Sequence, residues 1–428
     1  MIAPLLRVIH FGPLIALSII KCVVFTTLYL TGQWLRATDS LWALFNYMMY
    51  YTLIATTFYN FFSAVFTGPG QVPKGWQPAD PSDCQLLQYC HQCRGYKPPR
   101  SHHCRRCDRC VLKMDHHCPW INNCTGYRNQ CYFILFLGSA VLGSIQSIVL
   151  LSIGLYRAFY WNWFLYNERS DRLVYITMTS LLFGVFSIGL ALGVIIAVGG
   201  LLILQLKILV KNETSIEEWI VTKAKSRRGG GRSGDQFVYP YNLGVWRNIR
   251  QVLFGSIDNG ISWPVIDGCD QYTLTVEQLL QKEEKRNRSA TFRAIAGYNG
   301  HWFPLFSQGC RICLAFPMSD EPRIKVTTGD HILVTRCKNH WMYGEKVVNP
   351  RTPIIGGHHN NNHNHRRERG WFPRKIVIHV QTAATATHNH DVPVPQQPPP
   401  SQQLFDDKLY ETNDKNNLNT VLTNNNDF

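Results

Sequence analysis

The sequence predicts a polytopic α-helical membrane protein with a cysteine-rich domain between its second and third spans and a small β-rich domain toward its C-terminal end. Three observations support this fold class. The 428 residues include four long apolar stretches, although the overall hydrophobic content is an ordinary 45%. Nine of the 14 cysteines lie between Cys84 and Cys131. Short β-rich segments separated by turn residues follow between positions 323 and 380.

The four apolar stretches are the expected transmembrane helices. They occupy residues 11–31, 41–66, 130–159 and part of 173–210. Each is long enough for the roughly 20 residues that cross a bilayer as a helix. The first stretch lacks the short apolar core and the cleavage site of a signal peptide, so we expect it to remain in the chain although Lys21 interrupts it.

The charge of the segment between the second and third stretches predicts the topology. Residues 67–129 contain nine Lys or Arg against four Asp or Glu, which places them in the cytosol by the positive-inside rule. With four spans, both termini are expected to be cytosolic too. The formal net charge of +15 suits an anionic membrane surface, a phosphate-bearing ligand or nucleic acid.

The cysteine-rich segment has the spacing of metal ligands. Its cysteines and histidines follow the pattern Cys90-x2-Cys93, His103-Cys104-x2-Cys107-x2-Cys110, Asp115-His116-His117-Cys118 and Cys124. A Cys-x2-Cys turn brings two sulfurs to one zinc ion. Residues 90–124 contain six cysteines besides Cys118, and five histidines. Two four-ligand sites would need eight ligands and therefore two of these histidines, and spacing leaves open which two. Secreted disulfide domains are also cysteine-dense, but the neighbouring spans favour reduced thiols.

One block within this segment also has the residues of a nucleophilic site. A cysteine nucleophile needs a base, and the base needs an orienting acid. Cys118, His116 and Asp115 supply these three groups within four residues. A rigid scaffold would have to hold them in line, and two adjacent zinc ions would provide it.

The full pattern resembles the DHHC family of protein S-acyltransferases, also called palmitoyltransferases. It runs without a gap from Cys90 to Phe133, as Cys-x2-Cys-x9-His-Cys-x2-Cys-x2-Cys-x4-Asp-His-His-Cys-x5-Cys-x4-Asn-x3-Phe. The resemblance implies two zinc sites with interleaved ligands, Cys90, Cys93, His103 and Cys110 in one and Cys104, Cys107, His117 and Cys124 in the other. His116 then remains as the base for Cys118, with Asp115 as its orienter.

The resemblance also implies the reaction and its further residues. Cys118 would take a long-chain acyl group from acyl-CoA, such as palmitoyl-CoA, and pass it to cysteines of substrate proteins near the membrane. Thr214 and Ser215 resemble the family's Thr-Thr-x-Glu motif, so we expect the Ser215 hydroxyl to bond Asp115. A helix cap is the alternative interpretation of these two residues. Asn248 is expected to satisfy backbone groups near the site. An ordinary solvated charge is the favoured role, and contact with the coenzyme A phosphates the alternative role, of Arg100, Arg105, Arg106 and Lys113.

The C-terminal part predicts a helix at residues 275–288 and strands at 323–326, 331–336, 341–346 and 374–380. The segments around Gly329-Asp330, Trp341–Gly344 and Gly370–Pro373 resemble an SH3 domain. A DHHC core with an SH3-like β-barrel resembles the subtype of the sixth mammalian family member. That subtype implies an endoplasmic reticulum membrane location, with the Golgi membrane as the alternative, and a small membrane selenoprotein as a partner of the SH3-like domain.

The complete expected fold is a four-helix membrane protein with a cytosolic two-zinc domain and a C-terminal SH3-like barrel. The expected division is transmembrane helices 1 and 2 in 1–66, the zinc-binding DHHC domain in 67–131, transmembrane helices 3 and 4 in 132–210, a membrane-proximal region in 211–290, the SH3-like domain in 291–380 and a disordered tail in 381–428. The sequence disfavours two other functions. A zinc-finger nucleic-acid binder is disfavoured by the apolar spans, and an idle scaffold by the complete Asp115–Cys118 block.

Overall fold

The structure is a computed structural model, and it describes residues 7–167, 174–228, 237–254, 259–319, 321–347 and 368–380. The chain forms two compact units, Met1–Ser289 and Ala290–Phe428. The expected tail at 381–428 lies outside the described residues.

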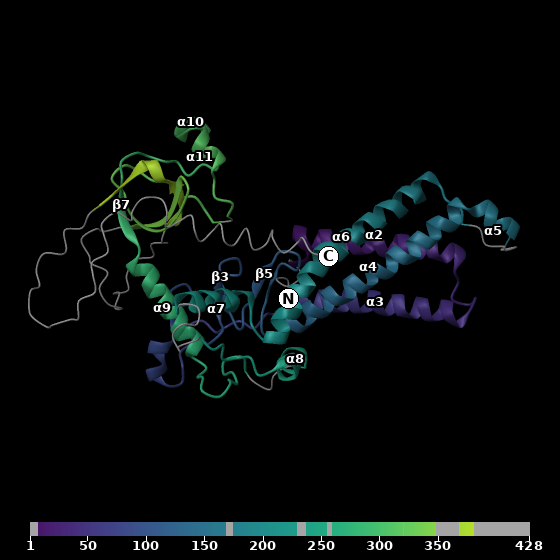
Figure 1. Cartoon of the computed structure of the whole chain (residues 1–428), viewed down its shortest axis with the longest axis horizontal. Helices are drawn as coiled ribbons and strands as arrows, with labels where there is room; N and C mark the ends of the chain where they lie inside the picture. The colour runs from purple at the N-terminus through teal and green to yellow at the C-terminus, as the bar shows by residue number, and fades with distance from the viewer. Residues whose placement is uncertain are drawn as a thin grey trace, which may run out of the picture. The chain divides into compact units, whose positions relative to one another are not determined.

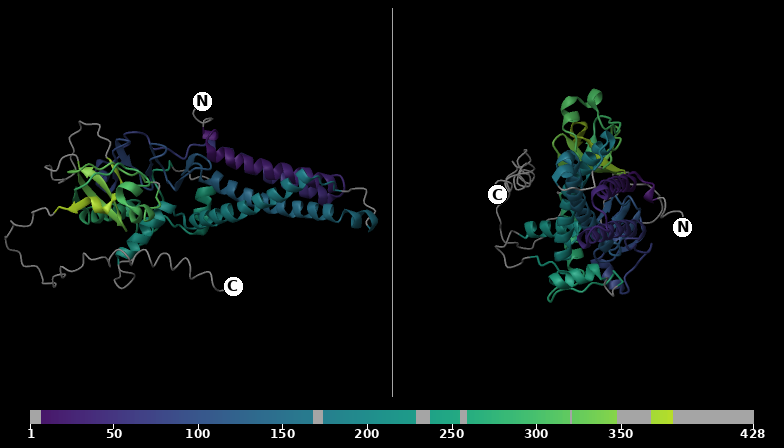
Figure 2. Two further views of the ribbon diagram at one scale, coloured as in Figure 1. Left: turned by 90° about the horizontal axis from the view of Figure 1, so that it is seen from above. Right: turned by 90° about the vertical axis from the view of Figure 1, so that its right-hand side faces the viewer.

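Four long helices of the first unit lie side by side (Figures 1 and 2). They are α2 (Phe11–Trp34), α3 (Leu41–Phe66), α4 (Gln130–Phe159) and α6 (Met178–Lys211). Helix α4 packs against both α3 and α6, and α2 packs against α4 and α6. The hydroxyl groups of Tyr50 on α3 and Ser147 on α4 lie 2.8 Å apart inside the bundle. At Gly184 on α6, a side chain would lie 3.3 Å from Leu30 and Leu155, so the missing Cβ allows close helix packing.

Among the described helices, α2, α4 and α6 are long and apolar enough to cross a membrane. Helix α3 is not among them. It begins and ends where the second apolar stretch does, but its tyrosine, threonine and asparagine residues lower its mean hydropathy. A short helix, α5 (Trp161–Asn167), follows α4.

The cysteine-rich segment follows a 3₁₀ helix, η1 (Pro81–Leu86), and consists of three antiparallel hairpins. These pair β1 (Gln88–Cys90) with β2 (Gly95–Lys97), β3 (His102–Cys104) with β4 (Arg109–Val111), and β5 (His116–Cys118) with β6 (Asn123–Thr125). Each turn contains one residue with positive φ, namely Arg94, Asp108 and Asn122. Such tight turns bring paired ligand side chains together at the ends of the strands.

Three helices complete the first unit: α7 (Ser215–Arg227), α8 (Val245–Leu253) and α9 (Thr273–Asn287). A capping box starts α7, in which the Thr214 side chain and Glu217 each bond the other's backbone amide. Apolar side chains of α7 and α9 form a core with Tyr241 and Trp263. This core lies under the cysteine-rich segment, since Tyr127 packs against Trp263 with ring centroids 5.5 Å apart.

The second unit contains one antiparallel sheet with strand order β10-β9-β8-β7-β11. The strands are β7 (Ala290–Ala294), β8 (His331–Lys338), β9 (Trp341–Val347), β10 (Arg369–Pro373) and β11 (Val377–His379). Two short helices, α10 (Leu305–Gln308) and α11 (Cys310–Leu314), precede β8. The core of the sheet includes the fully buried Trp341, Phe372 and Ile332.

One strand prediction for this unit was wrong, and a second was right only for the last part of its segment. Residues 323–326 make only isolated bridges, between Arg323 and Trp371 and between Val326 and Tyr298. Residues 374–380 begin with a 3₁₀ turn, η3 (Arg374–Ile376), before the short β11. The sequence analysis also missed β7, which pairs with both β8 and β11.

Candidate functional site

The block Asp115–Cys118 lies on the third hairpin, at the end of the helix bundle. The backbone amide of Asp115 donates to the Thr125 carbonyl, which continues the β5–β6 ladder. Asn123 on β6 donates from its side chain to the carbonyl oxygens of Ala64 and Val65, at the end of α3. The loop after Cys118 reaches α2, where a Cβ on Gly12 would lie 2.0 Å from the Pro119 carbonyl oxygen. The hairpin is therefore fixed against the ends of two helices of the bundle.

Asp115 and His116 form the expected acid–imidazole pair. Asp115 Oδ2 lies 2.8 Å from His116 Nδ1. Asp115 also accepts hydrogen bonds from the Ser215 backbone amide at 2.6 Å and from the Gln205 side chain at 2.9 Å. Burial alone would raise the pKa of Asp115, but these hydrogen bonds more than offset burial and lower the pKa to about 2. Asp115 is therefore a carboxylate at neutral pH, able to orient the imidazole.

His116 lies between this carboxylate and Cys118. Burial would lower the pKa of His116, but hydrogen bonds to Asp115 and Cys118 outweigh burial and raise the pKa to about 10. The imidazole ring also packs edge-on against Phe133, with ring centroids 5.5 Å apart. At this pKa the imidazole carries a proton at neutral pH, and a cationic group beside a cysteine is a setting in which thiols become reactive.

Cys118 is buried in an apolar cluster of the helix bundle. The cluster contains Phe61 on α3, and Phe133, Phe136 and Leu137 on α4. Cys118 does not belong to either group of candidate metal ligands in the described chain. The structure thus brings a free thiol, an imidazole and an apolar surface together at one place.

Two clusters of three cysteines and one histidine surround the block. They are Cys90, Cys93, His103 and Cys110, and Cys104, Cys107, His117 and Cys124. In the first, His103 Nδ1 lies 3.5 Å from Cys90 Sγ and 3.4 Å from Cys93 Sγ. In the second, His117 Nδ1 lies 3.4 Å from Cys107 Sγ and 3.6 Å from Cys124 Sγ. Tetrahedral zinc with these ligands separates nitrogen from sulfur by about 3.5 Å. The donor atoms therefore fit zinc, and both clusters have the membership implied by the family resemblance.

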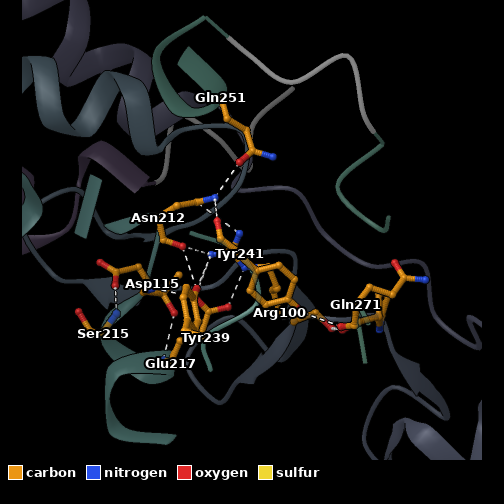
Figure 3. A network of polar contacts seen from close by, with 12 residues as sticks. Arg100, Asp115, Asn212, Ser215, Glu217, Tyr239, Tyr241, Gln251 and Gln271 are labelled. Atoms are coloured by element: carbon orange, nitrogen blue, oxygen red, sulfur yellow. Dashed lines mark hydrogen bonds and ion pairs between the residues drawn. The ribbon is translucent and has the colours of Figure 1, made fainter. Parts of the chain in front are cut away.

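A buried ion pair ties the cysteine-rich segment to α7 (Figure 3). Arg100 donates to both Glu217 carboxylate oxygens, at 2.7 and 2.9 Å, and to the Asn212 carbonyl at 2.6 Å. Its guanidinium group stacks on the rings of Tyr241 and Trp263. Neither Arg100 nor Glu217 exposes any of its side chain.

Both expected roles of Arg100 and Lys113, as solvated charges or as coenzyme A neighbours, were wrong. Arg100 is fully engaged with Glu217, and Lys113 is buried over the Trp263 ring. Burial and the charge of Arg100 hold the pKa of Lys113 well below its usual value. Arg105 and Arg106 are exposed on the β3–β4 turn, as a surface contact with phosphate would require.

The Ser215 prediction was right about the partner but wrong about the atom. Ser215 donates to Asp115 from its backbone amide, because this residue is the first of helix α7, where backbone N–H groups are free to bind an acceptor.

Asn248 bonds two backbone groups as expected, the Val210 carbonyl at 2.7 Å and the Leu243 amide at 3.0 Å. Sequence analysis missed Gln205, although a single glutamine late in an apolar span was a usable signal.

Comparison with known proteins agrees with this site. Residues 84–221 match the family model of the DHHC palmitoyltransferases. The chain is 41% identical over 386 residues to the palmitoyltransferase ZDHHC6 of Danio rerio, which covers 87% of this chain and 91% of the relative. ZDHHC6 of Homo sapiens gives the same identity and coverage. The probable protein S-acyltransferase 13 of Arabidopsis thaliana is 31% identical over 237 residues, 51% of this chain and 71% of the relative. The chain belongs to the DHHC palmitoyltransferase family.

Proposed function

We propose that this chain is a protein S-palmitoyltransferase that uses Cys118 as its nucleophile. The observation that carries the proposal is the position of Cys118, a cysteine outside both ligand clusters that lies beside a histidine held by Asp115 at 2.8 Å. The apolar cluster around the thiol supports a lipid substrate. The ZDHHC6 relatives are named as palmitoyltransferases, which supports the same reaction class.

The reaction proceeds by two acyl transfers. The Cys118 thiolate attacks the thioester carbonyl of a long-chain acyl-CoA, a new thioester bond forms, and coenzyme A leaves as a thiolate that takes the proton of His116. A substrate cysteine then gives its proton to His116 and attacks the acyl-enzyme, which frees Cys118. Asp115 fixes the ring of His116 throughout, because it holds Nδ1 and leaves Nε2 for the proton transfers.

The zinc ions have a structural role in this proposal. Zinc bound to the two clusters would supply crosslinks between the hairpins, which have few other means of holding a shape. The eight ligand residues would hold the two zinc ions, and the thiol of Cys118 would remain unbound and able to react.

The substrate comes from the bilayer and the cytosol together. Phe61, Phe133, Phe136 and Leu137 would contact the first part of the acyl chain, and each buried methylene contributes about 0.8 kcal/mol. The exposed Arg105 and Arg106 are the remaining cationic candidates for the phosphates of coenzyme A. Substrate proteins would present cysteines close to the membrane surface.

The membrane arrangement follows from the same reasoning. We assign α3 as a fourth span, because it runs beside α4. The end of α3 also contacts the third hairpin, as the start of α2 does. Four spans would place both termini in the cytosol with the zinc-binding domain. The division at 66, 131, 210, 290 and 380, the SH3-like identity of the second unit, the endoplasmic reticulum location and a small selenoprotein partner also remain proposals. The antiparallel sheet of the second unit supports the SH3-like identity, whereas the location and the selenoprotein partner rest on the family resemblance alone.

Acylation by labelled palmitoyl-CoA tests the proposal. The purified chain should acquire label that hydroxylamine removes, and Cys118→Ser should abolish it while zinc content stays unchanged. Cys131→Ser is the matched control, because Cys131 is a partly buried cysteine outside both clusters, and this variant should label normally. A folded, zinc-loaded chain that takes no label would instead support the idle scaffold. Label that persists in Cys118→Ser would overturn the assignment of the nucleophile.

A further inference from the structure

The second unit has a group of exposed apolar side chains around α10 and α11, which project from the strands of that unit (Figure 1). Leu314 and Met318 are the most exposed, at 83% and 87%. We call the group the apolar rim, and its members are Trp302, Phe303, Leu305, Leu314 and Met318. Soluble surfaces seldom gather large apolar side chains in one place unless something covers them.

The rim is held in this outward position by the fold. Ile312 of α11 is buried in the core, and its carbonyl accepts a hydrogen bond from the Trp341 indole at 3.0 Å. The carbonyl of Gln308 on α10 accepts one from Lys375 at 2.7 Å. These two bonds tie α11 to β9 and α10 to η3, and Leu314 and Met318 lie on the exposed side of this segment.

Trp302 is fixed by a stacked cation. The Arg323 guanidinium lies 3.7 Å from the centroid of the Trp302 ring and 5.3 Å from that of Trp341. This arrangement holds the exposed indole against the unit and leaves its other face uncovered. An indole in such a position is suited to the interface between water and lipid.

The second unit carries an excess of positive charge, and one of its cations, Arg311, lies on α11 itself. Residues 290–380 contain thirteen Lys or Arg against five Asp or Glu. Each described carboxylate of the unit is in an ion pair, for example Glu321 with Arg336 at 2.6 Å and Asp330 with Lys346 at 3.0 Å. Among the described residues, several cations have no carboxylate partner, namely Arg293, Arg311, Lys325, Lys338 and Arg374.

We propose that the apolar rim docks the second unit onto an anionic lipid bilayer surface. Interfacial membrane binding has two features. Apolar side chains enter the headgroup region, and cations attract the anionic lipids. The spans of the first unit keep a bilayer permanently near, so even weak docking is favoured by the high effective concentration. A second copy of the chain is a poorer occupant, because it would bring the same excess of positive charge to the contact.

Hydrogen–deuterium exchange of the full chain in lipid nanodiscs tests this proposal. Amides of residues 302–318 should exchange about tenfold more slowly in discs containing phosphatidylserine than in discs of phosphatidylcholine alone. The double variant Leu314→Ser, Met318→Ser should lose this protection. Ile378→Ser is the matched control, because Ile378 is 50% exposed on β11 outside the rim, and this variant should keep the protection.

Three results would overturn the proposal. Exchange of residues 302–318 could be the same in both lipid compositions. The protection could persist in the double variant while the rest of the second unit exchanges as in the unaltered chain. The protection could instead increase with the number of chains per disc and not with the anionic lipid, which would indicate a second copy as the occupant.

Discussion

Replacing Glu217 by glutamine should weaken both the fold and the acylation of Cys118, whereas the same change at the adjacent Glu218 should do neither. Both carboxylates belong to the first turn of α7, and each lies 2.7 Å from a basic group. Their surroundings differ. The side chains of Arg100 and Glu217 are fully buried, whereas those of Lys207 and Glu218 are 49% and 46% exposed.

The expected size of each effect follows from that exposure. Glutamine at 217 keeps the shape of the side chain but leaves the buried Arg100 without a countercharge, which costs about 3–5 kcal/mol of folding free energy. The exposed pair between Lys207 and Glu218 contributes about 0–1 kcal/mol, because water screens it. The Glu217 change should also disturb Thr214, whose amide donates to the carboxylate at 2.8 Å, and through it the start of α7.

Catalysis is expected to suffer because Ser215 donates to Asp115 from that first turn. A displacement of about 1 Å in a catalytic group lowers rates by about 100-fold. The assay compares the initial rate of Cys118 acylation, the thermal unfolding midpoint and the zinc content of Glu217→Gln and Glu218→Gln in one detergent. Equal behaviour of the two variants would refute the reasoning, as would normal acylation by a destabilised Glu217→Gln.

Three other changes give separate tests. Asp115→Asn should lower the acylation rate by about 10³- to 10⁴-fold with zinc unchanged, because an amide does not hold His116 in the productive orientation, and a rate within tenfold of the unaltered chain would contradict this. Cys104→Ser should remove about one zinc ion per chain, as measured by plasma mass spectrometry, since it breaks one cluster and spares the other; full retention of both ions would count against the assigned ligands. Lys113→Met should raise the unfolding midpoint at neutral pH. The folded chain holds the pKa of Lys113 well below its usual value of about 10.4, so Lys113 takes up a proton on unfolding, and this uptake favours the unfolded chain. Methionine removes that contribution. The stability of the unaltered chain then rises with pH between those two pKa values, so the advantage of Lys113→Met should shrink toward pH 10, and a constant advantage would be inconsistent with this cause.

The parts of the molecule that sequence analysis anticipated depend on local spacing. The bounds of helices α3 and α4 coincide with those of the apolar runs at residues 41–66 and 130–159, because a long uninterrupted apolar run without Gly–Pro breaks favours one continuous helix. The two ligand clusters could be anticipated because each is built from short Cys-x2-Cys turns with a characteristic spacing. The pairing of Asp115 with His116 could be anticipated for the same reason, since these residues and Cys118 are near neighbours in the chain.

The parts that sequence analysis missed depend on contacts between distant segments. Gln205 reaches Asp115 across 90 residues, and nothing in the sequence near either residue requires that contact. Strand β7 alternates apolar and polar residues over only five positions, as Ala-Thr-Phe-Arg-Ala, and it is a strand because β8 and β11 supply hydrogen-bonding partners on both sides. Residues 323–326 alternate in the same way, but one isolated bridge at each end does not make a strand.

Arg100 shows why such a residue is misjudged from sequence. An arginine among other basic residues is normally a surface charge, since arginine is seldom buried without a partner. Its partner Glu217 lies 117 residues away, and the capping box at the start of α7 already accounts for a glutamate at that position. Glu217 therefore has two roles at once, as the cap of Thr214 and as the countercharge of Arg100. Arg100 itself is bonded to neither Asp115 nor His116 in the described structure. Ser215, however, follows Thr214 and donates to Asp115. The buried ion pair and the carboxylate of Asp115 therefore depend on the same turn of α7.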